Sequence, residues 1–505
     1  MYPGPTDIPI AVSIASLAQG AATLLYALAQ TGLLVYASHR HSLVFARRGR
    51  VPVRPAAPAE WPGVLVQLPV YNEPAVIERL IAAAARLDYA ADRLTIQVLD
   101  DSTDETSCLA SEACGLWRER GIRIEHVRRA SREGFKAGAL AHGLRRSDAP
   151  LIAVFDADFV PPSSFLRDLV PYFEEELVGL VQARWGHLDR DRSLLTRAQA
   201  AMLDAHFLLE HTVRQARGQF FNFNGTAGIW RRRCVEDAGG WSHDTLTEDL
   251  DLSYRAQLAG WRFVFDPDVV VPAELPADMR AFQTQQRRWA TGAIQTARKV
   301  LPELLTRPLP GSLKLEAVLH LTANAAYPLL LALSLLLLPV LTGPRTLPPE
   351  VTLALQILVL TFGALPVALF LIAGQRAAGR PWHLAVMDGA LALALGVGMT
   401  LNNTRAVITG LRTRGGIFER TPKRGDGRIR PVPAASGPAG LESVLALLFA
   451  AMLAWAGASG HASAVPFLTL LAASHAWVAL APRGGNDEAR HEGGGLRELP
   501  DPETG

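Results

Sequence analysis

Residues 151–159 read LIAVFDADF, an uninterrupted apolar run followed by two carboxylates one residue apart. A short apolar run of this kind is typical of a strand buried on both faces. On an extended segment, residues i and i+2 share a face, so Asp156 and Asp158 can point into one site. The stretch therefore predicts a buried strand over residues 151–155 that ends at an acidic site.

Similar strands surround this one in the sequence. The apolar pattern predicts strands over 63–69 (GVLVQLP), 94–99 (LTIQVL) and 122–127, and it predicts helices over 74–87 and 136–144. Strands that alternate with helices favour an α/β domain with a mostly parallel sheet covered on both faces. In such sheets ligands bind beyond the carboxyl ends of the strands, and Asp100 and Asp101 follow LTIQVL at one such end.

The paired carboxylates suggest a metal. Two carboxylates, together with phosphate oxygens and water, suit a hard divalent ion such as Mg²⁺ or Mn²⁺. The alternative is that acidic turn residues simply end a strand, and the second acidic strand end favours the metal. The sequence contains neither a G-x-x-x-x-G-K-[ST] loop nor a G-x-G-x-x-G motif after a strand, which disfavours ATP hydrolysis and NAD chemistry. A nucleotide-diphosphate ligand remains open.

Two further clusters stand out downstream. Residues 247–249 (TED) open a helical pattern, where the threonine could cap the helix and the acids could complement its dipole instead of doing chemistry. Gln285, Arg288 and Trp289 stand at i, i+3 and i+4 and share one helix face. An amide, a guanidinium and an indole suit phosphate binding beside sugar stacking, although an Arg/Trp anchor at a membrane surface is the alternative.

Charge is divided unevenly along the 505 residues. Residues 61–300 hold 62 charged residues, about 26%, whereas the other 265 residues hold 36, about 14%. A formal net charge of +2 gives no reason to propose nucleic acid, and three cysteines exclude a disulfide-stapled chain. The division indicates a soluble domain built into a membrane protein.

Five apolar stretches are long enough to cross a bilayer, namely 11–36, 315–342, 351–373, 441–458 and 462–480. We interpret the first as a retained anchor because no basic segment precedes it and it is too long for the apolar core of a signal peptide. Basic residues follow it, so the N-terminus is expected outside and residues 37–310 in the cytoplasm. Residues 384–401 are short and contain Asp388, and we expect them to lie in or dip into the interface.

Read in order, eight motifs resemble the membrane-integrated family 2 β-glycosyltransferases, which include cellulose synthases and glucomannan (mannan) synthases. They are VYNE (70–73), LDDSTD (99–104), KAGAL (136–140), FDADF (155–159), FNGTAGIWRR (223–232), TEDLDLSYR (247–255), QQRRW (285–289) and FERTPK (418–423). The resemblance implies an α/β GT-A-type (Rossmann-like) domain inserted between transmembrane helices. It also implies an inverting transfer of a sugar.

The resemblance further implies a role for each matching residue. Asp249 would be the general base, with Glu248 beside it in the catalytic motif. The donor would be bound by Tyr71, Glu73, Asp101, Lys136, Asp156, Asp158, Gln285 and Arg288, with Asp158 and Asp156 at the metal. The acceptor would contact Trp289, Asn224 and Gly225, and Phe418, Thr421 and Lys423 would belong to a gating loop that closes over the donor.

The domain boundaries follow from both lines of reasoning. We expect an N-terminal transmembrane helix (1–36), a basic, proline-rich cytoplasmic linker (37–62), the cytoplasmic GT-A domain (63–310), two transmembrane helices (311–374), an interfacial segment with the gating-loop-like region (375–431), two further transmembrane helices (441–481) and a disordered cytoplasmic tail (482–505). The protein would be a multi-pass protein of the cell inner (plasma) membrane.

The implied reaction transfers a hexose from a UDP-glucose or GDP-mannose type of donor to a growing β-linked polysaccharide such as a β-glucan or glucomannan. Partners would be the nucleotide sugar, the acceptor and the membrane, and could include export or periplasmic proteins. NFNGTA and DDS depart from the cellulose synthase pattern, and LDDSTD looks closer to the plant mannan-synthase-like branch. Transfer of one or a few sugars to a lipid acceptor is the alternative, and a non-catalytic scaffold is a third reading.

Overall fold

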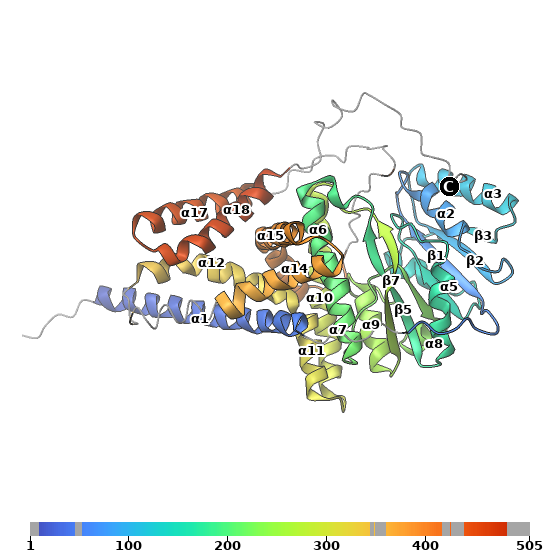
Figure 1. Ribbon diagram of the computed structural model, residues 1–505, viewed down its shortest axis with the longest axis horizontal. Coiled ribbons are helices and arrows are strands. Elements are labelled where there is room, and N and C mark those ends of the chain that lie inside the picture. The colour runs from blue at the N-terminus through green and yellow to red at the C-terminus, as the bar shows by residue number, and fades with distance from the viewer. Residues whose placement is uncertain are drawn as a thin grey trace, which may run out of the picture.

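A computed structural model describes residues 10–45, 53–343, 348, 360–416, 425 and 439–481. The soluble part is built on one seven-stranded sheet with the strand order β3-β2-β1-β4-β6-β5-β7 (Figure 1). The strands are β1 (Val64–Val70), β2 (Leu94–Asp100), β3 (Ile124–Arg128), β4 (Leu151–Val154), β5 (Val178–His187), β6 (Gly228–Arg231) and β7 (Arg262–Ala273).

Strand direction confirms the expected mostly parallel sheet. Strands β1 to β4 are mutually parallel, and β6 alone among the seven runs the other way, antiparallel to both β4 and β5. Strand β7 is parallel to β5. Consequently, six strands present their carboxyl ends at the same edge of the sheet, where the ligand site of such a fold is expected.

Both faces of the sheet are covered by helices, which explains why its central strands are apolar without alternation. Along β4, Leu151 and Ala153 pack into one core, whereas Ile152 and Val154 pack into the other. The first core is completed by α2 (Ile77–Ala85), α3 (Thr106–Glu119) and α5 (Phe165–Leu169), and the second by α4 (Phe135–Leu144), α8 (Arg232–Asp237) and α9 (Glu248–Leu258).

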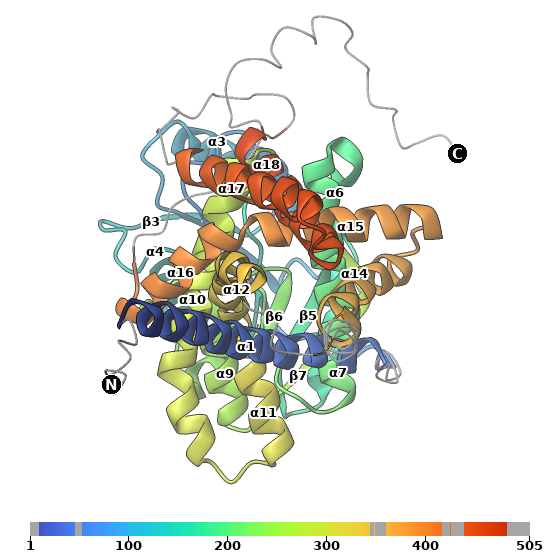
Figure 2. The ribbon, with the colours of Figure 1, turned by 90° about the vertical axis from the view of Figure 1, so that its left-hand side faces the viewer.

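The remaining helices lie beyond strands β5 and β7, on the side of the molecule that holds α1 (Figure 1). Next to the sheet domain are α6 (Leu194–Ala205), the π-helix η3 (His206–His211), α7 (Thr212–Ala216), α10 (Met279–Thr306) and α11 (Gly311–Leu321). Farther out are α1 (Ile10–Val44), α12 (Ala326–Thr342), α14 (Leu365–Ala377), α15 (Trp382–Gly398), α16 (Thr400–Arg412), α17 (Ala439–Ala458) and α18 (Val465–Leu480). Figure 2 shows α1, α12, α17 and α18 from the side away from the sheet.

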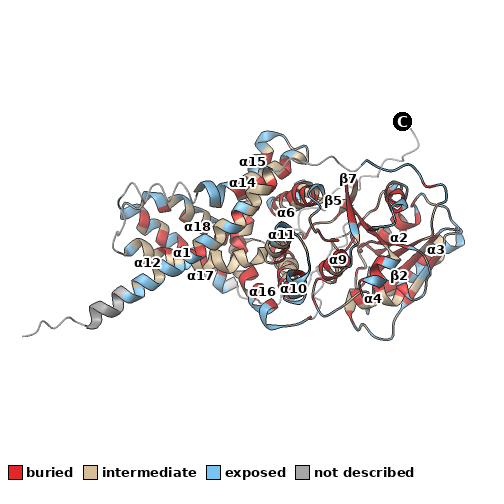
Figure 3. Ribbon diagram, turned by 90° about the horizontal axis from the view of Figure 1, so that it is seen from below, coloured by how far each residue is buried: buried red, intermediate tan, exposed pale blue. Residues whose placement is uncertain are grey.

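Four of these helices are long and apolar enough to cross a membrane: 17–44, 323–342, 440–458 and 462–480. Large apolar side chains lie exposed along them, for example Leu17 at 70% and Leu447 at 71% exposure. Figure 3 shows the contrast with the sheet domain, whose strands are largely buried. Exposed apolar surface of this extent on long helices is typical of contact with lipid.

The predicted span over 315–342 contains a break. Helix α11 ends at Leu321, a 3-10 turn covers Ala323–Ala325, and α12 begins at Ala326. The part before the break is not purely apolar, because Glu316 on α11 is buried and forms ion pairs with Arg214 and His39. The apolar part of the segment therefore starts at residue 323 rather than 315.

Several other expectations concern residues that lie partly or wholly outside the described part of the chain. Helix α14 continues from the π-helical segment η5 (Leu360–Ala364), and residues 351–359 of the predicted span at 351–373 lie outside the described part. Helices α15 and α16 form a pair bent by 53°, which is either a broken span or a re-entrant loop. The gating residues Phe418, Thr421 and Lys423 and the tail 482–505 also lie outside it.

Candidate active site

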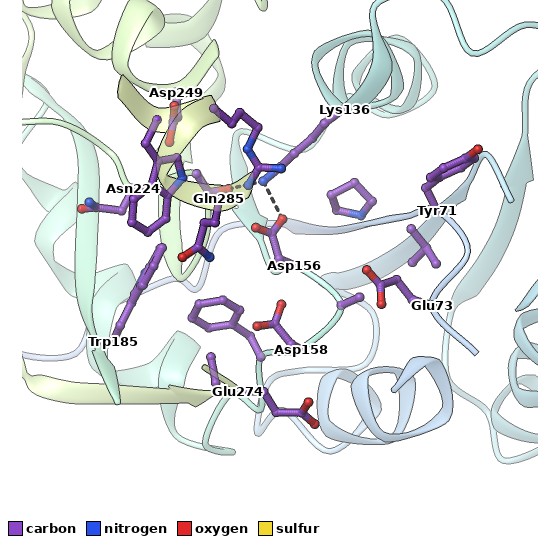
Figure 4. Close-up of a pocket in the computed structure, with 18 of the residues that line it drawn as sticks. Tyr71, Glu73, Lys136, Asp156, Asp158, Trp185, Asn224, Asp249, Glu274 and Gln285 are labelled. Atoms are coloured by element: carbon purple, nitrogen blue, oxygen red, sulfur yellow. Dashed lines mark hydrogen bonds and ion pairs between the residues drawn. The ribbon is translucent and has the colours of Figure 1, made fainter. Parts of the chain in front are cut away.

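One cavity lies at the carboxyl edge of the sheet, between the strand ends and helices α9 and α10. It is lined by the thirteen donor-binding, acceptor-binding and catalytic residues expected from the sequence, apart from the gating segment: Tyr71, Glu73, Asp101, Lys136, Asp156, Asp158, Asn224, Gly225, Glu248, Asp249, Gln285, Arg288 and Trp289. Figure 4 shows how ten of the lining residues face the cavity. Residues spread over 219 positions of sequence thus meet in one place because parallel strands bring their ends together.

The backbone of the D-x-D pair has a different conformation from the extended one that the sequence predicts. The amide of Phe159 donates to the carbonyl of Asp156 at 3.1 Å, so residues 156–159 form a turn and not an extended segment. The expectation of strand-like alternation over these residues was therefore wrong. Both carboxylates nevertheless line the cavity, with Asp158 buried and Asp156 about one third exposed.

Lys136 ties the D-x-D turn to the loop before β6. Its Nζ lies 2.5 Å from Oδ1 of Asp156 and donates to the carbonyl of Gly225 at 2.8 Å. Burial works against the charge of Lys136, but the carboxylates of Asp156 and Glu248 outweigh it and raise the pKa of the ammonium group. Lys136 therefore stays positively charged inside the cavity.

Asp249 lies in the first turn of α9, is half-buried and faces the cavity. Its Oδ1 accepts from the amide of Leu250 at 2.8 Å, and a Cβ placed on Gly225 would lie 2.9 Å from its Oδ2. Burial, reinforced by the negative charge of Glu248, raises the pKa of Asp249 to about 7 despite the nearby Lys136. A carboxyl group with such a pKa can exchange a proton near neutral pH. Thr247 makes no side-chain capping bond to this helix, so the capping alternative has no hydrogen bond behind it.

Helix α10 presents Gln285, Arg288 and Trp289 to the cavity. Burial lowers the pKa of Arg288, while surrounding carboxylates, led by Glu248, act in the opposite direction. The ring of Trp289 lies 6.5 Å from that of Trp185, centroid to centroid, at an interplanar angle of 54°. A guanidinium group and two indole rings thus line the same wall, as the substrate-binding interpretation of this helix face expects.

At the opposite end of the cavity, two arginines that the sequence analysis did not identify hold Tyr71 and Asp101 in place. The guanidinium carbon of Arg132 lies 3.3 Å from the centroid of the Tyr71 ring. Nε of Arg129 donates to Oδ1 of Asp101 at 2.9 Å, and its NH2 group contacts Oδ2. Tyr71 and Asp101, which are expected at the nucleoside, are therefore each in contact with an arginine. No sequence motif indicated Arg129 or Arg132.

Trp185, His187 and Glu274 also line the cavity and were missed, but here the signal was present. Trp185 and His187 close β5, and Glu274 follows β7. Both strands run parallel to β4, since β4 and β5 are each antiparallel to β6. Ligands bind beyond the carboxyl ends of parallel strands, and this holds for residues 178–187 and 262–273 as it does for β2 and β4. The sequence signal for Trp185, His187 and Glu274 is therefore their place at the ends of these two strands.

A sheet of this topology, with acidic residues and arginines around a cavity at its carboxyl edge, has the GT-A-type fold and defines a glycosyltransferase domain. The model of "Glycosyltransferase like family 2" matches residues 62–292, which run from just before β1 into α10.

Curated relatives are glucomannan synthases of plants. The chain is 44% identical over 250 residues to "Probable glucomannan 4-beta-mannosyltransferase 10" of Arabidopsis thaliana, a match that covers 48% of this chain and 45% of that protein. It is 43% identical over 251 residues to "Glucomannan 4-beta-mannosyltransferase 1" of Cyamopsis tetragonoloba, with 49% and 48% covered. The match spans about half the length of these relatives.

Among solved structures, a mannosyltransferase from Pyrobaculum calidifontis in complex with GDP-Man and Mn2+ is similar to this chain. It shares 22% identity, covers 71% of this chain and 97% of its own, and superposes with a TM-score of 0.47.

Proposed function

We propose that the protein is a membrane-bound inverting glycosyltransferase that extends a β-linked polysaccharide from a nucleotide-diphospho-sugar. The observation that carries the proposal is the half-buried Asp249, with its raised pKa, facing a cavity that Lys136, Arg288 and the D-x-D carboxylates also line. Among donors of the UDP-glucose and GDP-mannose type, the plant relatives' printed activity favours a mannosyl donor and a glucomannan or β-mannan product.

Asp249 would act as the general base. A sugar hydroxyl is a weak nucleophile, and a positioned carboxylate assists by taking its proton in the transition state. With a pKa raised to about 7, Asp249 is a stronger base than an exposed aspartate would be. Attack on the anomeric carbon from the side opposite the leaving diphosphate inverts its configuration, so an α-linked donor gives a β-linked product.

Arg288 and Lys136 would stabilise the departing diphosphate. Negative charge grows on the leaving group as the glycosidic bond breaks, and fixed cations in a buried site offset it without reorganising. Both side chains line the cavity, and Lys136 retains its charge through the neighbouring carboxylates. Trp289 and Trp185 would provide apolar faces against which an acceptor sugar can stack.

Asp158 and Asp156 would hold a divalent ion together with oxygens of the donor. Within the described residues there is no group of three His, Cys, Asp or Glu side chains that could hold a metal ion. Two hard carboxylates therefore fit Mg²⁺ or Mn²⁺ only if the diphosphate and water complete the coordination. When bound, such an ion would neutralise charge on the leaving diphosphate.

The apolar helices would place this chemistry at the inner (plasma) membrane. In this arrangement five stretches cross the bilayer, namely α1, α12, the apolar stretch 351–373 expected from the sequence, α17 and α18. The sheet domain and the FERTPK segment then both face the cytoplasm, and the bent pair α15 and α16 lies at the interface. Basic residues that follow the first helix support this orientation. Export of the product through the helices is a further part of the proposal.

The test is to offer membranes containing the protein a panel of labelled nucleotide sugars, including GDP-mannose, GDP-glucose and UDP-glucose. We expect GDP-mannose to give an alcohol-insoluble polymer that an endo-β-1,4-mannanase degrades and a cellulase does not. A short product that partitions into organic solvent would instead indicate a lipid acceptor. Absence of transfer from every donor would contradict the proposal.

A further inference from the structure

A row of buried and part-buried hydrogen bonds fixes the side chain of Asn224 in the cavity wall. Nε2 of His211 lies 3.1 Å from the carbonyl oxygen of Asn222 and 2.9 Å from Oδ1 of Asn224. Because a backbone carbonyl can only accept, Nε2 of His211 carries a proton. Oδ1 of Asn224 is therefore an acceptor, and turning the amide over would set one N–H against another.

The row continues on the other side of the amide. Nδ2 of Asn224 lies 2.9 Å from Nε2 of His206 and donates to it, so His206 carries its proton on Nδ1. That nitrogen lies 2.9 Å from Oε2 of Glu210, which accepts. Glu210 in turn contacts Arg40 at the end of α1 and lies 3.5 Å from Arg214. Each hydrogen bond from Asn222 to Glu210 thus has only one possible direction.

The π-helix η3 makes this arrangement possible. In a regular α-helix, residues five apart are rotated by about 140° and face different directions. The i→i+5 pattern of a π-helix places them one above the other, and the ring centroids of His206 and His211 are only 4.4 Å apart. Both imidazoles therefore reach the same asparagine.

Their surroundings keep both imidazoles neutral. Burial, followed by the charge of Arg214, lowers the pKa of His211 to about 3, and three phenylalanine rings surround it: Phe207, Phe221 and Phe265. Burial, followed by His211, also lowers the pKa of His206 well below its ordinary value. A neutral His206 is what the row requires, since its Nε2 must accept from Asn224.

We propose that His206 and His211 are positioning residues for the acceptor sugar, acting through the Asn224 amide. Asn224 lines the cavity, whereas neither histidine does. The two bonds use one N–H and one lone pair of the amide, and the other N–H and lone pair can meet an acceptor hydroxyl beside Trp289. The inference rests on the proposed transferase function and adds residues to the acceptor side of the same site.

The test uses the full-length protein in membranes with labelled GDP-mannose and a soluble β-1,4-mannan oligosaccharide. We expect His206→Leu to raise the acceptor KM about tenfold and to leave the donor KM within about twofold, because one oriented hydrogen bond is lost. His206→Gln should recover most of the loss, since its amide oxygen can accept from Asn224. If the leucine variant fails to fold, His206→Phe retains the ring volume and gives the same comparison.

Two controls separate positioning from general packing. His320 is a half-buried histidine like His206, but it bonds to the hydroxyl of Tyr254 at 2.7 Å, so His320→Gln should leave the acceptor KM unchanged. In an Asn224→Ala background, His206→Leu should have no further effect on the acceptor KM.

If the wild type transfers mannose, three results would contradict the inference without contradicting the proposed function. They are an unchanged acceptor KM in His206→Leu, an equal rise of donor and acceptor KM, and a full effect that persists in the Asn224→Ala background. A wild type that transfers from no donor in the panel would contradict the proposed function itself, and the inference with it.

Discussion

The carboxyl groups on the two walls of the cavity have different surroundings. On the sheet wall, formed by the loops after β1, β2 and β4, Asp101 is bound by Arg129 and Asp156 by Lys136. On the helix wall, formed by α9 and α10, Asp249 is half-buried beside another acid, Glu248, and desolvation followed by the charge of Glu248 raises its pKa to about 7. Cations pair with the two carboxylates of the sheet wall, whereas on the helix wall the pKa of Asp249 is raised.

This difference suggests a division of labour. Carboxylates that are paired with cations can hold and orient a charged donor without changing protonation, whereas a buried carboxyl with a raised pKa can accept a proton. Changes to the carboxyl group of Asp249 on the helix wall should therefore act on kcat, and changes to the carboxyl groups of the sheet wall on the donor KM or the metal requirement.

Removing the base should give the largest effect. We expect Asp249→Asn to lower kcat by about 10²- to 10⁴-fold, the range for loss of general base catalysis, because an amide cannot take the acceptor proton. Labelled nucleotide should still bind with nearly unchanged affinity, which also shows that the variant folds. Normal turnover by Asp249→Asn would remove Asp249 as the base and the contrast between the walls with it.

Metal removal tests the sheet wall. In washed membranes, a chelator should lower transfer by at least about 10²-fold, since the ion supplies several kcal/mol of charge stabilisation. Added Mg²⁺ or Mn²⁺ should restore it, and Asp158→Asn should need a higher metal concentration for half-maximal rate. Full activity in excess chelator would contradict the metal role of Asp158.

Gly225 stands where the two walls meet, and replacing it should disturb the helix wall. Its φ of +83° is unfavourable for alanine, and an added Cβ would lie 2.9 Å from Oδ2 of Asp249. We expect Gly225→Ala to lower kcat by roughly 10²-fold, because displacement of a catalytic group by about 1 Å costs that much.

Gly121 provides the matched control. Its φ is +84°, but a Cβ there would meet nothing within 4 Å. Gly121→Ala should therefore carry a similar backbone cost, about 1–3 kcal/mol in the free energy of unfolding, and leave kcat unchanged. Equal kcat losses in both variants would show that strain, and not the contact with Asp249, is responsible.

The sequence could predict the elements and single residues of both walls better than the contacts between them. Apolar runs and turns predict β1, β2 and β4 and the acids after them, because these signals are local in the chain. The ion pair between Lys136 and Asp156 and the contact between Gly225 and Asp249 join residues 20 and 24 positions apart, and only the fold brings them together. The π-helix that pairs His206 with His211 likewise has no local signature, since LDAHFLLEH reads as an ordinary helical stretch.

Replacing Tyr71 on the sheet wall should have a smaller effect, and this effect should be on the donor KM. If its ring stacks on the nucleotide base, Tyr71→Ala should raise the donor KM about tenfold, within the range of about 1–3 kcal/mol for base stacking, and leave kcat nearly unchanged. Tyr71→Phe keeps the ring, and its donor KM should stay within about twofold of the wild type. A fall in kcat without a change in donor KM would contradict the division between the walls.

The smallest expected effect is a shift in pH dependence. Glu248, Lys136, Asp156 and Arg288 are the charged neighbours of Asp249, and after burial Glu248 contributes most to its raised pKa. The base acts in its deprotonated form, so kcat of the wild type should fall as the pH drops below about 7. Glu248→Gln removes a negative charge, lowers the pKa of Asp249, and should move this acidic limb to lower pH, with only a modest loss of kcat at the optimum. An acidic limb that stays in place, measured at saturating donor and acceptor, would mean that another group titrates and that the raised pKa of Asp249 does not set the rate.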